Sequence, residues 1–257
     1  MSKNINAPDL IDKLLLPHTP WALLFLIPIT FLGFYPSYYS TFQATGILHF
    51  HSALMTLWLA VAIIQPWLIK THRIKFHRWI GKFSLFLLPM ILMFGYFVLR
   101  SGYLRVFDGD KVAPPGYYPE GADSLTKAGD FVVIGFIYFM WLLIYYIVGI
   151  VFRKKTYAHA PFMLAAVLTI LGPAGDRLIG HICDAMGWEF NVIAQNFIFG
   201  SVFLVFFALL LSHYKRNLPL WPSGTVLYIH LMGVFFFYYL PFNSVWDRVA
   251  AIIFYIY

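Results

Sequence analysis

Apolar stretches close to the length of one membrane crossing recur along this chain and limit what it can fold into. They cover residues 21–39, 46–69, 79–99, 131–152, 160–179, 192–212 and 224–240. A helix needs about 20 apolar residues to cross a hydrocarbon core of about 30 Å. Because backbone polar groups in lipid must be satisfied within the protein, helices are the expected structure. The sequence therefore predicts an all-α integral membrane protein, an antiparallel bundle of seven transmembrane helices.

The basic residues divide unequally between the two ends of these helices. With the N-terminus in the cytoplasm, the inner side carries twelve of the 18 lysines and arginines and two of the 11 acids. The inner basic residues are Lys3, Lys13, Lys70, Arg73, Lys75, Arg78, Lys82, Arg153, Lys154, Lys155, Lys215 and Arg216. The net charge is then +10 inside and −3 outside, in agreement with the total of +7. Since cytoplasmic loops are enriched in Lys and Arg, we expect a cytoplasmic N-terminus. The positive charge then reflects membrane topology and not binding to nucleic acid.

The helices leave little chain for a separate soluble domain, as 61% of the residues are hydrophobic and 11% are charged. We expect a cytoplasmic N-terminal segment at residues 1–20, the seven-helix bundle at 21–240 and a short C-terminal helix at 241–257. The C-terminal helix is interfacial or half-spanning, because its apolar run at 249–257 extends only about 14 Å. If it crossed the membrane, it would be an eighth span. An outer loop with proline and glycine turns is expected over residues 100–130.

Polar side chains recur at helical spacing on three of the predicted spans. Such residues are costly in lipid and therefore face the bundle interior. The first stripe is His51, Met55, Trp58, Ala62 and Gln65; the second is His77, Gly81, Ser84 and Leu88; the third is His159, Met163, Ala166, Ile170, Pro173 and Arg177. His49 is about 200° around the helix from His51 and points elsewhere. At the inner ends of other spans, His72 and His213 are expected to meet lipid headgroups.

The second and third stripes begin with histidines at the same expected depth. Their spans run in the same direction, so His77 and His159 both lie near the inner face. Two histidines on parallel helices can supply both axial ligands of a b-type haem. Arg78 and the basic residues near it would pair with the propionates, and Met163 would contact the ring. This pattern predicts a redox protein that exchanges electrons with quinone or a partner protein.

Two other functions fit the polar residues. His51, Asp176 and His181, with Asp184 and Glu189 in reach, could bind a divalent metal ion at the outer face, since imidazole and carboxylate ligands suit zinc, iron or copper. Alternatively, a transporter or sensor would use an interior polar path, because ionisable residues within spans often mark such pathways. That path would comprise His51, Gln65, Arg177, Asn196 and His230. A purely structural subunit of a larger assembly is a further alternative.

The segment His77-Arg78-Trp79-Ile80-Gly81-Lys82 resembles the His-Arg-x-x-Gly-Arg element of a bacterial membrane family, domain of unknown function 2306. In that family a histidine opens the preceding span, a place taken here by His51 or His49. A later span of the family begins His-Arg-x-Trp-Met and carries a distal arginine, which resembles His159, Met163 and Arg177. The family's Arg-x-Trp is replaced here by Ala-Pro-Phe.

This resemblance covers residues 45–180 and implies a bacterial inner-membrane protein, but the family supplies no activity. The arrangement of histidines is also similar to that of transmembrane di-haem b-type cytochromes. Those proteins place ligands on four successive helices, whereas the span at 131–152 contains no histidine. The resemblance therefore implies one haem or none.

Overall fold

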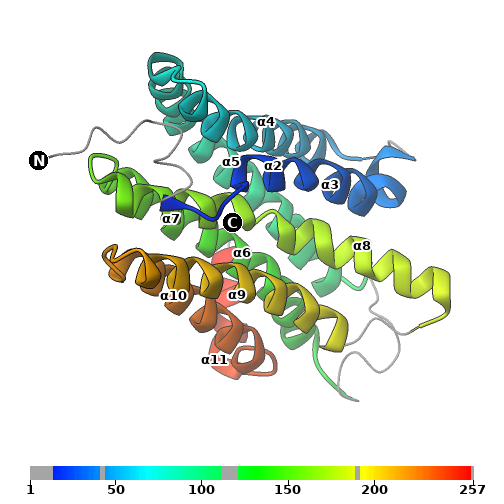
Figure 1. Ribbon diagram of the computed structural model, residues 1–257. Helices are drawn as coiled ribbons and strands as arrows, with labels where there is room; N and C mark the ends of the chain where they lie inside the picture. Colours follow the sequence, from blue (N-terminus) through cyan, green and yellow to red (C-terminus); the bar gives the residue numbers. More distant parts are fainter. Residues whose placement is uncertain (1–13, 41–43, 111–120, 189–191, 256–257) are drawn as a thin grey trace, which may run out of the picture.

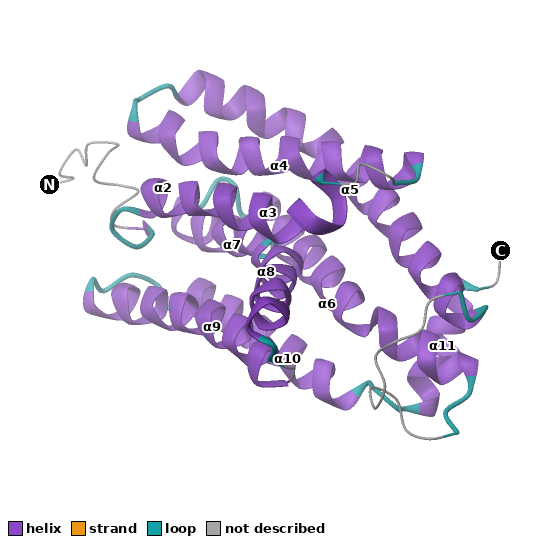
Figure 2. Ribbon diagram, turned by 90° about the vertical axis from the view of Figure 1, so that its right-hand side faces the viewer, coloured by secondary structure: helices purple, strands orange, loops and turns teal. Residues whose placement is uncertain are grey.

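The computed structural model describes residues 14–40, 44–110, 121–188 and 192–255, and within these ranges the chain forms helices and no strand (Figures 1 and 2). The first helices are short: α2(Thr19–Ala22), η1(Leu23–Phe25), α3(Leu26–Phe34) and the π-helical η2(Tyr35–Tyr39). They are followed by α4(Gly46–Lys70), α5(Ile74–Phe107), α6(Ser124–Val151), α7(Thr156–Leu168), α8(Leu171–Met186), α9(Val192–Lys215), α10(Trp221–Tyr239) and α11(Ser244–Phe254). The prediction of an all-helical fold is confirmed for the described residues.

Six helical segments in the described part of the chain are long and apolar enough to cross a membrane, and some of them consist of several helices in succession. They are Thr19–Tyr39, Gly46–Lys70, Ile74–Phe107, Ser124–Val151, Thr156–Met186 and Gln195–Lys215. A seventh candidate is the pair α10 and α11, whose axes are bent by 104° at a short break. The architecture is consistent with a multi-pass helical membrane protein. The six or seven candidates include all the apolar stretches expected from the sequence.

The helices form an elongated bundle in which α6 is central. It packs against α5 and α7, which are its neighbours along the chain, and against α10 and α11. The first span packs against a helix that is distant in the sequence, because α3 contacts α8. The turns α4–α5, α6–α7 and α9–α10 all lie toward the left in Figure 1. These turns carry the clustered lysines and arginines, so one end of the bundle is strongly basic.

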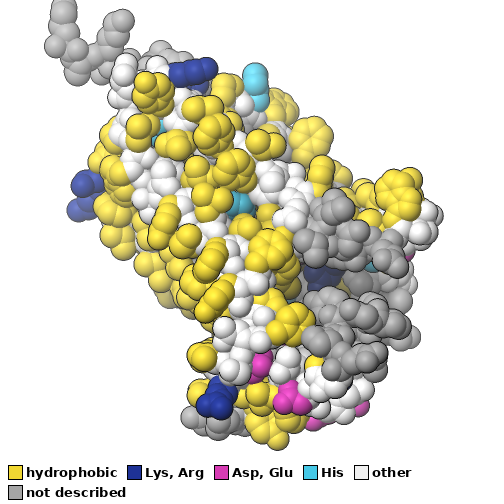
Figure 3. Space-filling view, turned by 90° about the horizontal axis from the view of Figure 1, so that it is seen from below, with side chains coloured by type: hydrophobic (Ala, Val, Ile, Leu, Met, Phe, Trp, Pro, Cys, Tyr) yellow, Lys and Arg dark blue, Asp and Glu magenta, His cyan; other side chains and the backbone are white. Residues whose placement is uncertain are grey.

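The outside of the bundle is apolar. Large hydrophobic side chains that are more than half exposed include Phe76 (60%), Trp79 (69%) and Phe86 (74%) on α5. Hydrophobic side chains cover the middle of the face seen in Figure 3, and the acidic side chains visible there gather at its lower end. An apolar surface of this size is expected where lipid replaces water.

Two boundaries differ from those expected. The loop predicted over residues 100–130 is shorter, because α5 continues to Phe107 and α6 begins at Ser124. Asp123 caps α6 by accepting a hydrogen bond from the Thr126 amide at 2.8 Å, and this bond holds the pKa of the exposed Asp123 carboxyl below its ordinary value. Residues 111–120, including the proline-rich part of that loop, lie outside the described residues.

The chain segments at both ends of the sequence also pack on the bundle. The short C-terminal helix begins at Ser244 and ends at Phe254; Asn243 caps it by accepting from the amides of Val245 and Trp246. Near the other end, Leu14 and Leu15 are buried, and residues 1–13 lie outside the described part. His213 donates from Nε2 to the Leu14 carbonyl at 2.9 Å and is completely buried. The prediction that His213 meets lipid headgroups is therefore wrong, whereas His72 is exposed.

Candidate functional site

The predicted pair of histidines lies at the basic end of the bundle, at the start of two different helices. His77 lies in the first turn of α5 and His159 in the first turn of α7, and the two side chains interact electrostatically. His159 donates from Nδ1 to the Gly149 carbonyl on α6 at 2.8 Å. That bond fixes the ring tautomer and leaves Nε2 as the nitrogen with a lone pair. Three helices thus position this histidine pair.

Unsatisfied polar atoms surround His77. Gln65 on α4 donates from Nε2 to the His77 backbone carbonyl at 3.2 Å. Its Oε1 and the Nδ1 of His77 are both buried without a hydrogen-bond partner. A buried polar atom without a partner costs about 1–3 kcal/mol. This buried nitrogen and oxygen could therefore bind a ligand atom.

Small residues and a methionine complete the surroundings of the pair. Among the described residues outside its own helix turn, only Gln65 Nε2 comes within 4 Å of where a Cβ would lie at Gly81, at 3.8 Å, so there is space beside that glycine. Met163 places its sulfur against Gly149. One turn further along α5, Ser84 and Tyr146 share a hydrogen bond of 2.8 Å between their hydroxyls. Arg78 is exposed.

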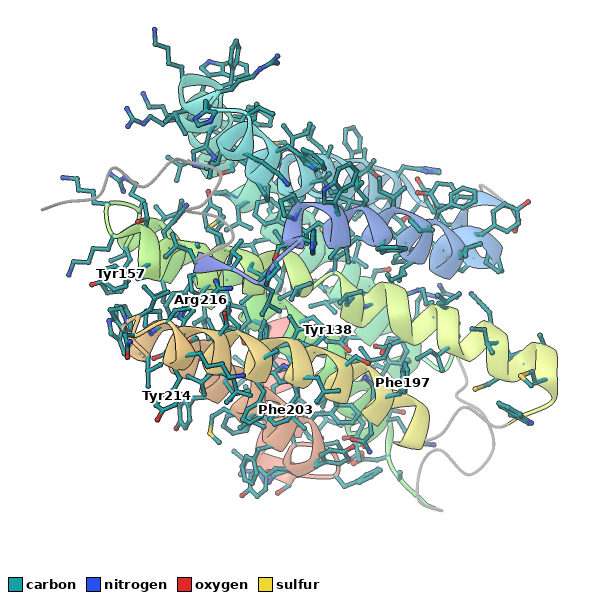
Figure 4. All side chains as sticks on the ribbon, viewed as in Figure 1. Tyr138, Tyr157, Phe197, Phe203, Tyr214 and Arg216 are labelled. Atoms are coloured by element: carbon teal, nitrogen blue, oxygen red, sulfur yellow. The ribbon has the colours of Figure 1, made fainter. Side chains whose placement is uncertain are left out.

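A second polar cluster lies on α8, which the sequence placed at the opposite end of the bundle. Tyr138 on α6 donates to Asp176 Oδ2 at 2.9 Å, and Gln195 on α9 donates to the Tyr138 hydroxyl at 3.3 Å. Figure 4 shows Tyr138 in the space between α8 and α9. Arg177 donates to the Pro173 carbonyl at 2.7 Å and lies over the Phe34 ring at 4.7 Å. Asp176 and its neighbour Arg177 therefore hydrogen-bond to different groups.

The residues expected to form the outer metal site are held by separate partners. His51 on α4 has a buried Nδ1 without a hydrogen-bond partner. Its ring packs against Gly95 on α5, where a Cβ would lie 3.4 Å from His51 Cε1. His181 donates from Nε2 to the Gly33 carbonyl at 3.2 Å. Among the described residues, no group of three or more His, Cys, Asp and Glu could hold a metal ion. His51, Asp176 and His181 therefore do not form a ligand set, and Glu189 lies outside the described residues.

The predicted polar path is not continuous. On α4, Trp58 is 2% exposed and lies between His51 and Gln65 on the same face. Asn196 is exposed on α9, where it accepts a hydrogen bond of 2.6 Å from Tyr238; its interior placement was wrong. Arg177, also placed inside by the sequence, is exposed. His49 is partly buried and bonded to Tyr38 at 2.8 Å.

His230 is the member of that path with the deepest position. It is 1% exposed, donates from Nε2 to the Phe199 carbonyl at 3.1 Å and stacks on Trp141 with 4.9 Å between ring centres. A cavity beside it, lined also by Tyr138 and Thr169, has a volume of about 10 Å³. That is about the room that one water needs. His230 is thus a hydrogen-bonded residue of the core.

Several buried polar residues are not predicted by the sequence. Tyr138 was read as part of an apolar span, although its hydroxyl bonds to Asp176. Asp130 and Asp247 are 6% and 4% exposed, and Tyr103 is completely buried. For Asp130 the sequence contains a signal, because its carboxylate directly precedes the long apolar run at residues 131–152.

Comparison with known proteins found no match for this chain. No family model matches the chain, and no curated protein or solved structure matches it significantly. The resemblance to domain of unknown function 2306 and to di-haem cytochromes therefore stays a prediction.

Proposed function

We propose that the chain is an integral protein of the bacterial inner membrane with its N-terminus and its basic turns in the cytoplasm. In this arrangement six helices cross the membrane, and α10 with α11 forms a broken seventh span. Support comes from the location of the clustered lysines and arginines in the turns α4–α5, α6–α7 and α9–α10 at one end of the bundle (Figure 1). Positive charge of this kind marks the cytoplasmic side of membrane proteins.

Within that bundle we infer a site for one b-type haem held by His77 and His159. The observation that carries this proposal is that His77 and His159 lie in the first turns of α5 and α7 at the same end of the bundle, within electrostatic range of each other. The bond from His159 Nδ1 to the Gly149 carbonyl is the type that orients a ligating histidine and leaves Nε2 for the metal. The unpartnered Nδ1 of His77 and the space beside Gly81 also fit a missing ligand group.

A bound haem supplies one-electron transfer between donors and acceptors. The protein residues then have separate tasks. Gly149 keeps His159 in one tautomer, and Gln65 fixes the backbone of His77. Arg78, exposed beside His77, would pair with a propionate, and Met163 would contact the ring. Quinone within the bilayer or a partner redox protein would be the electron donor or acceptor.

An absorption spectrum of the detergent-purified protein, oxidised and then reduced with dithionite, tests the haem. We expect a Soret band and a sharpened alpha band on reduction. His77→Ala and His159→Ala should each abolish or shift the Soret band. The matched control is His72→Asn, because His72 is exposed near the same end and asparagine tolerates its φ of 59°. A colourless wild-type protein from haem-replete cells would reject the haem site and favour the transporter or sensor alternative.

Accessible cysteines test the orientation. Cys183 is the single cysteine in the sequence, so Cys183→Ser provides a background without thiols. In that background Asp108→Cys and Lys154→Cys place one exposed thiol at each end of the bundle. A maleimide that does not cross membranes should label residue 108 in intact cells and residue 154 only after lysis. The reverse pattern would contradict the proposed orientation.

A further inference from the structure

The end of α5, the start of α6 and the whole of α11 meet at the end of the bundle away from the basic turns. The chain reaches this place through the 104° bend between α10 and α11. Phe242 lies in the bend with a left-handed φ of 60°, and its amide donates to Asp130 Oδ1 on α6 at 2.8 Å. Asp130 therefore holds the break in the helix.

A second carboxylate lies on α11 in the same region. Asp247 accepts a hydrogen bond of 3.0 Å at Oδ2 from the Thr126 hydroxyl on α6. The preceding residue, Trp246, donates from its indole to the Gly129 carbonyl at 2.9 Å. Asp130 and Asp247 interact electrostatically. Two carboxylates that are 94% and 96% buried are thus held together by the packing of α11 on α6.

Three oxygen atoms in this region are buried and have no hydrogen-bond partner. They are Asp130 Oδ2, Asp247 Oδ1 and the hydroxyl of Tyr103. Tyr103, on α5, is completely buried between the rings of Phe107 and Phe254, and its hydroxyl lies within electrostatic reach of Asp247. Each orphaned oxygen comes from a side chain on a different helix.

The two carboxylates also lack a counter-charge. Among the described residues, their hydrogen-bond donors are a backbone amide and a hydroxyl, both of them neutral. A buried carboxylate without a positive partner is strongly unfavourable, because hydrogen bonds alone replace its hydration only in part. Two such groups side by side repel each other as well. A positive charge between them resolves both problems.

We propose that Asp130 and Asp247 bind a divalent cation of the calcium type, with the Tyr103 hydroxyl as a third oxygen. Calcium takes oxygen ligands in flexible geometry and accepts waters in the remaining positions. Its two positive charges match the two carboxylates. Asp130 and Asp247 are the two buried carboxylates of the site, while the exposed Asp123 lies only within electrostatic range of Asp247. With two buried carboxylates this is a site of modest affinity. The cation links α5, α6 and α11 and fixes the bend after α10.

Thermal unfolding of the full-length protein in detergent tests this site. The protein is first treated with a chelator and then measured with calcium chloride, magnesium chloride or sodium chloride at matched ionic strength. We expect the unfolding temperature to rise with calcium concentration, because a ligand that binds only the folded state stabilises it. Sodium at the same ionic strength should have no such effect. Isothermal titration with calcium alone gives the dissociation constant directly.

Near-isosteric variants assign the site to these residues. Asp130→Asn and Asp247→Asn should each raise the calcium dissociation constant by about tenfold or more, since affinity follows the charge of the ligands. Asp108→Asn is the matched control, because Asp108 is exposed at the end of α5. If a variant fails to fold, Tyr103→Phe removes one ligand without changing charge and should weaken binding less. Absence of calcium binding by the wild type, or binding unchanged in Asp247→Asn, would overturn the proposal. None of these measurements depends on haem.

Discussion

Gly172 on α8 faces the ring of Tyr138 on α6 so closely that a methyl group at residue 172 would overlap the ring. The same helix contacts α3 at Ala174. The carbonyl oxygen of Ala174 lies so close to Gly33 that a Cβ at residue 33 would overlap it. Helices approach this closely in membranes where small residues line the contact. The close approach of α8 to α6 also sets the hydrogen bond from Tyr138 to Asp176.

We expect Gly172→Ala to destabilise the protein by about 1–3 kcal/mol, the usual cost of overpacking. The added methyl group must displace the Tyr138 ring and with it the bond to Asp176. Gly200→Ala is the control, because no other described part of the chain comes within 4 Å of where a Cβ would lie at Gly200 in α9. There alanine should be neutral or slightly stabilising. Thermal unfolding of both variants in the same detergent gives the comparison; equal stability would contradict the proposed contact.

Tyr138→Phe should also lower stability, by about 1–3 kcal/mol. Without the hydroxyl, Asp176 loses its hydrogen bond at Oδ2, while Oδ1 already lacks a partner. Tyr214→Phe removes a hydroxyl from a side chain that is 68% exposed and should have little effect. Chemical denaturation of the two variants measures the difference. A Tyr138→Phe protein as stable as the wild type would show that the hydrogen bond contributes no net stability.

Replacing His213 should release the N-terminal segment from the bundle. His213→Ala removes the donor to the Leu14 carbonyl and leaves a cavity at a completely buried position. We expect faster cleavage by a protease near residues 14–20, measured on inverted membrane vesicles. His72→Asn, an exposed histidine replaced near the same end, should be cleaved at the wild-type rate. Equal rates for all three proteins would contradict the anchoring role.

The N-cap of α6 should make stability depend on pH. The Thr126 amide holds the pKa of Asp123 below its ordinary value of 3.8. A lowered pKa in the folded state means that the stabilisation is present above pH 3.8 and is lost as the pH falls through the folded value. Asp123→Asn keeps a cap but cannot titrate. The wild type should therefore be slightly more stable than this variant at neutral pH, and the difference should vanish in acid, as thermal unfolding at both pH values can show.

The spans were predictable from the sequence because apolar length alone defines a membrane crossing. Their ends were not, since Arg100 and Arg105 made the last turns of α5 resemble a loop, although that helix continues to Phe107. Charged side chains at the end of a span extend toward water while the backbone remains helical. Hydropathy therefore gives the centre of such a helix better than its end.

The polar sites were predictable only in part. Helical spacing placed His77 and His159 on interior faces at one depth, and in the structure the two lie within electrostatic range of each other. Spacing placed Trp58 on the same stripe as His51 and Gln65, but it could not show that Asn196 turns outward. Which helices become neighbours depends on packing across the whole chain, and no single span contains that information.

The contact between Gly33 and Ala174 has a consequence for biosynthesis. The first span leaves the ribosome well before α8, which is the principal partner of α3. During that interval the glycine face of α3 has only lipid, or the insertion machinery, against it. Folding of the first span into the bundle must therefore wait until the fifth has been inserted, so the oldest helix of the nascent chain is among the last to reach its final neighbours.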